Sequence, residues 1–521
     1  MNYRLISKFL GIVSLLIGGM MLLSLPWSLP FLGGGDVVDR ASVAGLGVSS
    51  ILSAVLGAVL LYLGRGASGN LFRKEALAVV GLCWVLASFL GMCPFLFAGV
   101  SVGAERDAKG AILRAYPMGV VDAWFESVSG FTGTGATVIT DLDDPKLVPR
   151  AILFWRSETH FLGGLGIMVL FVAIFGQGSA GRALMRAEMP GPSKEVHQAR
   201  MQKAAWTFAA IYLGLNGVLT GLLYFEGMTL YDALCHSFGT IATGGFSTHN
   251  ASIAYFDSPM IEMTITAFMA ISCVNFVLIY FVLIGRPGKL FRDPEFRVYM
   301  AILFSASTLA ICFGLYHGDF DNLGSAVRYG LFQVTSILTN TGFGTHDFNQ
   351  WNEFGRGLLF TLMFIGGCAG STSCSVKVIR YLILVKALSL EAEKAYHPNV
   401  VRPIRVGEES VDAGVVGDVV RYFSFFLLIA VVAWLLLLAL EPDTTWVENG
   451  AGVHEKLMDC ASGVAATING VGPGLGTIGA TRNYALLQPE SKLILSILML
   501  LGRLEILPIL VLFAPGFWKS Q

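Results

Sequence analysis

Four glycine-rich turns contain the residues of this sequence that could do chemistry. They are Gly133-Thr134-Gly135, Thr243-Gly244-Gly245, Asn340-Thr341-Gly342 and Gly470-Val471-Gly472. Glycine adopts left-handed backbone conformations at no steric cost, so such turns can aim successive carbonyl oxygens at one point. Rings of backbone carbonyls can replace the hydration shell of a cation. The turns therefore predict a main-chain site for a largely dehydrated monovalent cation.

Each turn closes an amphipathic run of constant length, in which the last glycine follows the first residue by thirteen positions. The four runs are residues 122–135, 232–245, 329–342 and 459–472. This length is too short to cross a bilayer as a helix but suits a half-helix that enters, turns and leaves. Three runs begin with Asp122, Asp232 and Asp459, where a carboxylate is favourable beside the positive end of a helix dipole. We interpret the twelve turn residues as one ion filter around a common axis.

Longer apolar segments must position these half-helices. Hydrophobic residues make up 54% of the chain and charged residues 14%, which is typical of a membrane protein. Candidate spans lie at 8–32, 43–64, 75–99, 151–177, 203–226, 258–285, 297–317, 354–388, 416–440 and 489–514. We predict an all-α polytopic membrane protein with ten transmembrane spans and four re-entrant pore half-helices, in four repeats with fourfold pseudo-symmetry.

The alternation of spans and half-helices predicts the domain boundaries. They are an N-terminal hairpin over 1–70 and pore repeats over 71–180, 181–287, 288–405 and 406–521. Most of the 35 Lys and Arg residues fall in loops on one side, which predicts a cytoplasmic N-terminus and half-helices that enter from outside. The net charge of -1 argues against a nucleic-acid partner. The eight cysteines lack metal-ligand spacing, and we interpret them as small core residues.

The eighth span is interrupted by ten consecutive small residues, 366–375. Such residues are poor helix formers, and irregular backbone at membrane depth is tolerated only inside protein or beside a cavity. We predict a loop below the filter that acts as a gate; the alternative is the small-residue packing face of an intact helix. The candidate gate residues are Gly366, Gly367, Gly370, Ser371, Thr372, Ser373 and Lys377.

Several charged groups lie within or beside apolar segments. Arg503, in the last span, should face a partner or water, either as a fixed charge in the pore or as a tie to Glu505 or a carbonyl. For Arg156, with its neighbours Glu158 and His160, the topology predicts a place near the outer boundary and either snorkelling or a structural tie.

Polar groups that follow the first three turns allow two interpretations each. Asp141, Asp143 and Asp144 form either an outer vestibule that concentrates cations or a solvated loop. His249 and His346 either add pH sensitivity or are satisfied loop histidines.

The motifs together resemble those of a known family. Stretches 127–137, 240–250, 338–347 and 469–476, with Gly-Arg-Leu-Glu at 502–505 and His-Pro-Asn at 397–399, are similar to the Trk/Ktr/HKT superfamily of potassium transporters. The likeness is strongest to the bacterial TrkH/TrkG type and covers essentially the whole chain. It implies a K⁺-translocating subunit of the bacterial inner membrane that works as a homodimer, with K⁺ as the transported ion and no organic cofactor.

The resemblance also implies residue roles and a partner. Relatives with serine at the position of Gly135 tend towards Na⁺ transport, so glycine here resembles the K⁺ pattern. Their gating loop carries Gly-Gly-x-x-Gly-Ser-Thr, usually followed by glycines where this chain has Ser373-Cys374-Ser375. A TrkA-like cytosolic nucleotide-binding ring would bind the basic loops 182–203 and 377–421.

Three functions remain open at this point. The leading one is gated K⁺ uptake through the four turns, and the second is strictly Na⁺- or H⁺-coupled K⁺ symport. The third is a membrane enzyme with His160, Glu158 or His236 as acid–base groups. The sequence contains no nucleophile–base motif, no metal-ligand cluster and no phosphate-binding glycine loop, so we do not expect an enzyme.

Overall fold

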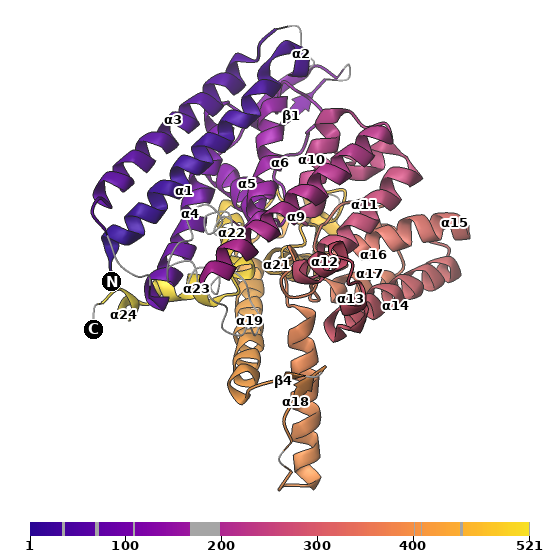
Figure 1. Ribbon diagram of the computed structural model, residues 1–521. Coiled ribbons are helices and arrows are strands. Elements are labelled where there is room, and N and C mark those ends of the chain that lie inside the picture. Colours follow the sequence, from indigo (N-terminus) through magenta and orange to yellow (C-terminus); the bar gives the residue numbers. More distant parts are fainter. Residues whose placement is uncertain are drawn as a thin grey trace.

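The computed structural model describes residues 1–33, 37–67, 72–107, 110–166, 198–400, 402–407, 409–448 and 452–519. Helices make up most of the described chain (Figure 1). Two antiparallel hairpins depart from the predicted all-α class: β1 (Ser101–Arg106) pairs with β2 (Ile112–Pro117), and β3 (Arg405–Val406) pairs with β4 (Glu409–Ser410).

Helices α1 (Tyr3–Ser24) and α3 (Arg40–Leu63) form an N-terminal hairpin and lie side by side (Figure 1). Small residues allow their backbones to approach closely, as in many membrane helix pairs. The Ser14 hydroxyl donates to the Ser53 carbonyl at 2.7 Å, and the Ser50 hydroxyl donates to the Gly18 carbonyl at 2.8 Å. The two hydrogen bonds tie the helices together at two levels.

Four long helices precede the four half-helices. They are α4 (Arg73–Phe97), α9 (Gln198–Phe225), α14 (Pro294–His317) and α19 (Ala413–Leu440). The start of α14 follows from sequence, because the Asp293 side chain accepts from the Phe296 amide and Pro294 occupies the first helical position.

The half-helices are α5 (Val120–Thr132), α10 (Leu230–Ile241), η3 with α16 (Ala326–Leu338) and α21 (Lys456–Ile468). The second helices of the repeats are α6 (Arg150–Leu165), α11 (Pro259–Ser272) with α12 (Phe276–Leu283), α17 (Glu353–Leu362) with α18 (Val378–Tyr396), and α22 (Pro489–Arg503) with α23 (Leu507–Leu510).

Two predicted spans are not continuous helices. Residues 258–285 are not one helix, because α11 and α12 meet at an angle of 108°. Residues 489–514 are also divided, because Glu505 and Ile506 take positive φ values of 56° and 70° between α22 and α23. The predicted interruption of 354–388 is confirmed: α17 ends at Leu362 and α18 begins only at Val378.

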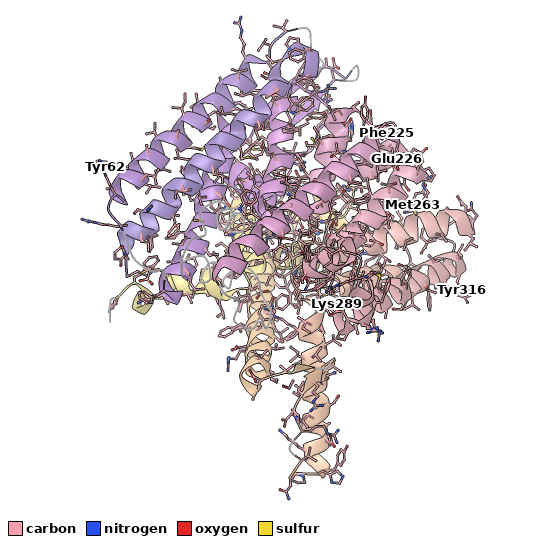
Figure 2. All side chains as sticks on the ribbon, viewed as in Figure 1. Tyr62, Phe225, Glu226, Met263, Lys289 and Tyr316 are labelled. Atoms are coloured by element: carbon pink, nitrogen blue, oxygen red, sulfur yellow. The ribbon has the colours of Figure 1, made fainter. Side chains whose placement is uncertain are left out.

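Six described helices are long and apolar enough to cross a bilayer, and the bent pair α11–α12 would make a seventh. The expected fourth span, 151–177, extends beyond the described residues. Tyr62, Phe225 and Tyr316 lie on the periphery (Figure 2), with exposures of 72%, 86% and 83%. Large exposed apolar side chains in such numbers are expected at a lipid interface.

The remaining short elements connect these helices. They are η1 (Leu25–Ser28), α2 (Pro30–Gly33), η2 (Ser252–Phe256), α13 (Gly288–Arg292), α15 (Leu323–Ser325), η4 (Phe348–Gln350), α20 (Thr444–Glu448), η5 (Val453–Glu455), η6 (Gly476–Ile478), η7 (Val511–Phe513) and α24 (Pro515–Trp518). Seven of the eight cysteines are buried as predicted, whereas Cys312 on α14 is exposed.

Candidate ion-conducting site

The four half-helices start slightly before the predicted positions. Asp122, Asp232 and Asp459 therefore lie within the first turn of α5, α10 and α21 and do not begin these helices. In α10 the Thr229 hydroxyl accepts from the Asp232 amide and caps the helix. The third half-helix differs, because η3 opens it with a π-helical turn and no acidic residue.

The four turns share one backbone conformation. In each, the first and third residues are left-handed: φ is 67° and 79° at Gly133 and Gly135, and 66° and 95° at Gly470 and Gly472. The other two turns follow the same rule, with φ of 53° and 77° at Thr243 and Gly245, and 59° and 79° at Asn340 and Gly342. The repetition that the sequence indicated therefore extends to the dihedral angles.

The amide groups of the turns bond back to the half-helices in the same pattern four times. The first amide donates to the carbonyl three residues earlier at 3.1–3.2 Å, and the second donates to the carbonyl five residues earlier at 2.8–3.0 Å. This satisfies carbonyls at the C-terminal ends of the half-helices. Among the described residues, no protein donor bonds to the carbonyls of the four first turn residues, or to those of Thr134, Thr341 and Val471. Gly244 differs, because its backbone contacts the buried His160 ring.

Contacts between consecutive turns close a ring. A Cβ built on Gly135 would lie closer than 3.0 Å to the carbonyl oxygen of Gly244, and one on Gly245 equally close to that of Thr341. The same holds for Gly342 against Val471 and for Gly472 against Thr134. Each repeat therefore contacts the next and the fourth contacts the first, which places the four turns around one axis. Only glycine allows this approach.

Asn340 stands apart within the ring. Its side chain is fully buried, and neither amide atom has a hydrogen-bond partner among the described residues. A buried unsatisfied amide is costly unless water or an ion completes its shell.

A buried ion pair supports the first turn from behind. Arg156 Nε donates to Glu126 Oε1 at 2.6 Å, and neither side chain is more than 2% exposed. Glu126 also accepts from the Val138 amide at 3.0 Å, and Arg156 donates to the Ser247 carbonyl at 3.0 Å. Of the two interpretations of Arg156, the structural tie is confirmed and snorkelling at the outer boundary is wrong.

Glu126→Gln is expected to destabilise the protein by about 3–5 kcal/mol, the usual cost of leaving a buried charge without its partner. The measurement is the melting temperature of the purified protein in detergent. Glu353→Gln is the control, because the Glu353 carboxylate is 88% exposed in its pair with Arg356. Equal melting temperatures for the two variants would contradict a structural role for Glu126.

The neighbours of Arg156 are buried too. His160 lies between the Gly130 carbonyl, at 2.7 Å from Nδ1, and the Phe246 amide, which donates to Nε2 at 3.1 Å. Glu158 accepts from the Ser24 hydroxyl at 2.7 Å. His236 contacts the Asp232 carbonyl and the Ser247 hydroxyl at 2.8 and 2.9 Å. His160 and His236 therefore support the second turn and the residues after it, whereas Glu158 is tied to the end of α1.

The acidic residues after the first turn are paired. Asp141 and Asp144 accept from Arg106 at 2.6 and 2.8 Å, and Asp143 accepts from His249 Nδ1 at 2.7 Å. These pairs fit neither of the predicted interpretations fully, because the carboxylates are neither simply solvated nor free to attract cations. His346 is likewise satisfied, since Trp351 Nε1 donates to its Nδ1 at 3.0 Å.

His249 makes stability depend on pH. Burial lowers the pKa of His249, but the carboxylates of Asp232, 3.6 Å from Nε2, and Asp143, hydrogen-bonded to Nδ1, outweigh it, so the pKa is raised above 6.5. The stabilisation by charged His249 is therefore fully present below the unfolded-state value and is lost as pH rises through the folded-state pKa. We expect His249→Gln to flatten the melting temperature against pH above neutrality, relative to the parent and to His317→Gln. Identical slopes in all three proteins would contradict the prediction.

The candidate gate is a loop between α17 and α18. Its base is closed by the Gly366 amide, which donates to Val376 at 2.9 Å, and the Val378 amide, which donates to Gly367 at 3.2 Å. The loop also contacts the second repeat, because the Cys368 amide donates to Cys273 at 2.8 Å. Lys377 is buried and donates to the Ser373 carbonyl within the loop.

The Ser373-Cys374-Ser375 segment, singled out as a departure from relatives, contacts the filter. Cys374 Sγ donates to the Thr132 carbonyl at 3.4 Å, directly before the first turn. The Ser375 hydroxyl donates to Asn469 Oδ1 at 2.8 Å, directly before the fourth turn. The candidate gate loop therefore lies against the end of the turns where the half-helices α5 and α21 stop.

Arg503 ties α22 to the candidate gate loop. Its Nη1 donates to the Thr372 carbonyl at 2.9 Å, and its Nη2 donates to the Gly163 carbonyl at 2.5 Å. Glu505 pairs with Arg380 and not with Arg503. Of the alternatives, the carbonyl tie is observed and the Arg503–Glu505 pair is not; the guanidinium also lines the cavity described next.

A cavity of about 100 Å³ lies beside the candidate gate loop. All four repeats line it, each near an end or a break of its second helix. The lining includes Gly166 after α6, Phe276 at the start of α12, the loop 370–375, and residues 502–505 at the end of α22. The sequence indicated only the third of these breaks. Asn275, which accepts from the Val277 amide at 2.8 Å and caps α12, was an overlooked polar signal in an apolar run.

The structure describes the two predicted regulator loops, 182–203 and 377–421, to different extents. The segment 182–197 of the predicted regulator loop 182–203 lies outside the described residues. The second loop includes α18, which projects from the helical body with β4 beside it (Figure 1).

The chain resembles known transport proteins in sequence and in structure. A family model described as "TrkH: Cation transport protein" matches residues 101–520. The Trk system potassium uptake protein TrkH of Escherichia coli (strain K12) is 36% identical over 523 residues, covering 100% of both chains. TrkG of the same organism is 36% identical over 423 residues, covering 79% of this chain and 83% of its own. The crystal structure of the potassium transporter TrkH from Vibrio parahaemolyticus superposes with a TM-score of 0.83 at 34% identity, covering 100% of both chains.

Proposed function

The chain belongs to the TrkH family of cation transport proteins, and from this premise we propose that it takes up K⁺ through the ring of four glycine turns. Like its relatives, it is a membrane transporter and not an enzyme. The observation that carries the proposal is the closure of the ring, in which each filter glycine contacts the next repeat. Buried carbonyls without protein donors can then coordinate K⁺ in place of water.

The loop 366–377 is proposed as the gate. Cys374 and Ser375 place it against the filter, and Arg503 holds it to the first and fourth repeats. Opening requires these contacts to exchange for others, so any activator must bind the open state more tightly than the closed state. A TrkA-like nucleotide-binding ring on α18 and the basic loops would supply that preference.

We further propose the arrangement of the chain in the membrane. The N-terminus is cytoplasmic, ten spans and four re-entrant half-helices cross or enter the bacterial inner membrane, and the repeats follow the predicted boundaries. Two copies form a homodimer. Bent or divided second helices still cross the bilayer as units, because the neighbouring repeats satisfy the backbone groups at each break.

The test is rubidium uptake into liposomes that contain the purified protein. We expect Rb⁺ uptake down its gradient in the absence of Na⁺ and of a pH difference. Excess K⁺ should block this uptake, and the same concentration of Na⁺ should not. Protein-free liposomes and denatured protein are the controls. Uptake that requires Na⁺ or protons would replace the proposal by coupled symport, and folded protein without uptake would refute K⁺ conduction by the chain alone.

A further inference from the structure

The filter ring has one irregular junction. The third residue of each turn has φ of 79° at Gly135, 77° at Gly245 and 79° at Gly342, but 95° at Gly472. A Cβ built on Gly472 would stand 2.5 Å from the Thr134 carbonyl oxygen, compared with 1.9–2.1 Å at the other three junctions. The seam between the fourth and first repeats therefore differs from the other three.

Tyr484 bridges this seam. Its hydroxyl donates to the carbonyl of Gly472, in the fourth turn, at 2.7 Å. Its backbone amide donates to the carbonyl of Thr137, just after the first turn, at 2.8 Å. One residue thus holds both sides of the irregular junction.

The position of the Tyr484 ring is fixed by packing. The side chain is 2% exposed, and its ring centroid lies 5.4 Å from that of Phe125 on α5. The hydroxyl therefore approaches Gly472 from the buried core and not from the ion path.

The contact also makes the four third-position carbonyls unequal. In the part of the chain that the structure describes, no protein donor bonds to the carbonyls of Gly135, Gly245 or Gly342. A carbonyl oxygen has two lone pairs, and Tyr484 takes one of those on Gly472. Three ligands of this ring are free, and the fourth is restrained by a side chain.

We propose that Tyr484 is a positioning residue for K⁺ selectivity: it closes the filter at the seam between the fourth and first repeats and sets the direction of the Gly472 carbonyl. The inference rests on the proposed function of the ring as a K⁺ filter. Without the hydroxyl, the Gly472 carbonyl is buried and unsatisfied and is free to turn, so the ring no longer favours one ion size.

The test substitution is Tyr484→Phe, which removes only the hydroxyl. We expect the K⁺/Na⁺ permeability ratio, measured by ion flux into liposomes, to fall about fivefold, the change that the loss of one net hydrogen bond produces in an equilibrium. Tyr231→Phe is the matched control, since its side chain is also buried and its hydroxyl donates to a carbonyl, that of Arg150, at 2.8 Å. Its ratio should equal that of the parent.

A second substitution preserves the shape of the side chain. Difluorotyrosine at position 484 is a stronger hydrogen-bond donor, and we expect it to shift the ratio in the direction opposite to Y484F. If the parent is K⁺-selective, the filter is upheld. Unchanged K⁺/Na⁺ permeability ratios in both position-484 variants would then overturn the role of Tyr484, whatever the melting temperatures of the variants. A parent without K⁺-selective flux would instead refute the proposed function itself.

Discussion

Gly135→Ser is expected to lower the K⁺/Na⁺ permeability ratio at least about tenfold, which requires a loss of about 1.4 kcal/mol in discrimination. Two effects add. A side chain at φ of 79° costs about 1–2 kcal/mol. Its Cβ would also lie closer than 3.0 Å to the Gly244 carbonyl oxygen, so the junction between the first two repeats must spread.

The control for this prediction lies two residues away. Gly133→Ser has comparable left-handed strain, with φ of 67°, but its Cβ would approach no atom more closely than the Ala242 carbonyl oxygen at 3.5 Å. We expect Gly133→Ser to retain more selectivity than Gly135→Ser. Rubidium and sodium flux into liposomes measures both ratios. Equal losses would assign the effect to strain, and no loss would remove Gly135 from the filter.

Deletion of residues 370–373 is expected to raise basal K⁺ flux about tenfold or more, since each 1.4 kcal/mol removed from the closed state is tenfold. The deletion removes the Thr372 carbonyl that Arg503 holds. It leaves the base of the loop intact, because Gly366–Val376 and Gly367–Val378 bonds lie outside it. The fold of α17 and α18 should therefore survive.

A length-matched variant separates obstruction from side-chain contacts. Replacing residues 371–373 by glycine, beside the native Gly370, keeps the chain length and should raise flux less than the deletion does. Flux is measured on protein that elutes as a single species in detergent, without any cytosolic partner. Unaltered or abolished flux in folded deletion protein would show that the loop is no gate.

The sequence predicted the repeated parts of the site well. The thirteen-position spacing predicted four helices that each end in a turn, and each turn has the same pattern of left-handed residues. The run of small residues predicted the break between α17 and α18. These features depend on local backbone preferences, which a sequence expresses directly.

The bends of the other second helices could not be predicted in this way. Hydropathy over 258–285 or 489–514 sums the transfer free energy of a segment and does not say where it bends. The break after α11 is completed by contacts from the third repeat, such as the Thr372 hydroxyl that donates to Ser272 at 3.1 Å. Only the packed structure brings those groups together.

The sequence by itself determined a membrane protein with four glycine turns, because composition and spacing are properties of the chain alone. The tertiary structure decided which groups meet: Arg503 bonds carbonyls 131 and 340 residues away, and Arg156 pairs with Glu126. Backbone carbonyls occur at every residue, so no sequence pattern marks the one that a distant arginine or tyrosine will bond. The order of the ring and its irregular seam at Tyr484 follow from that long-range packing.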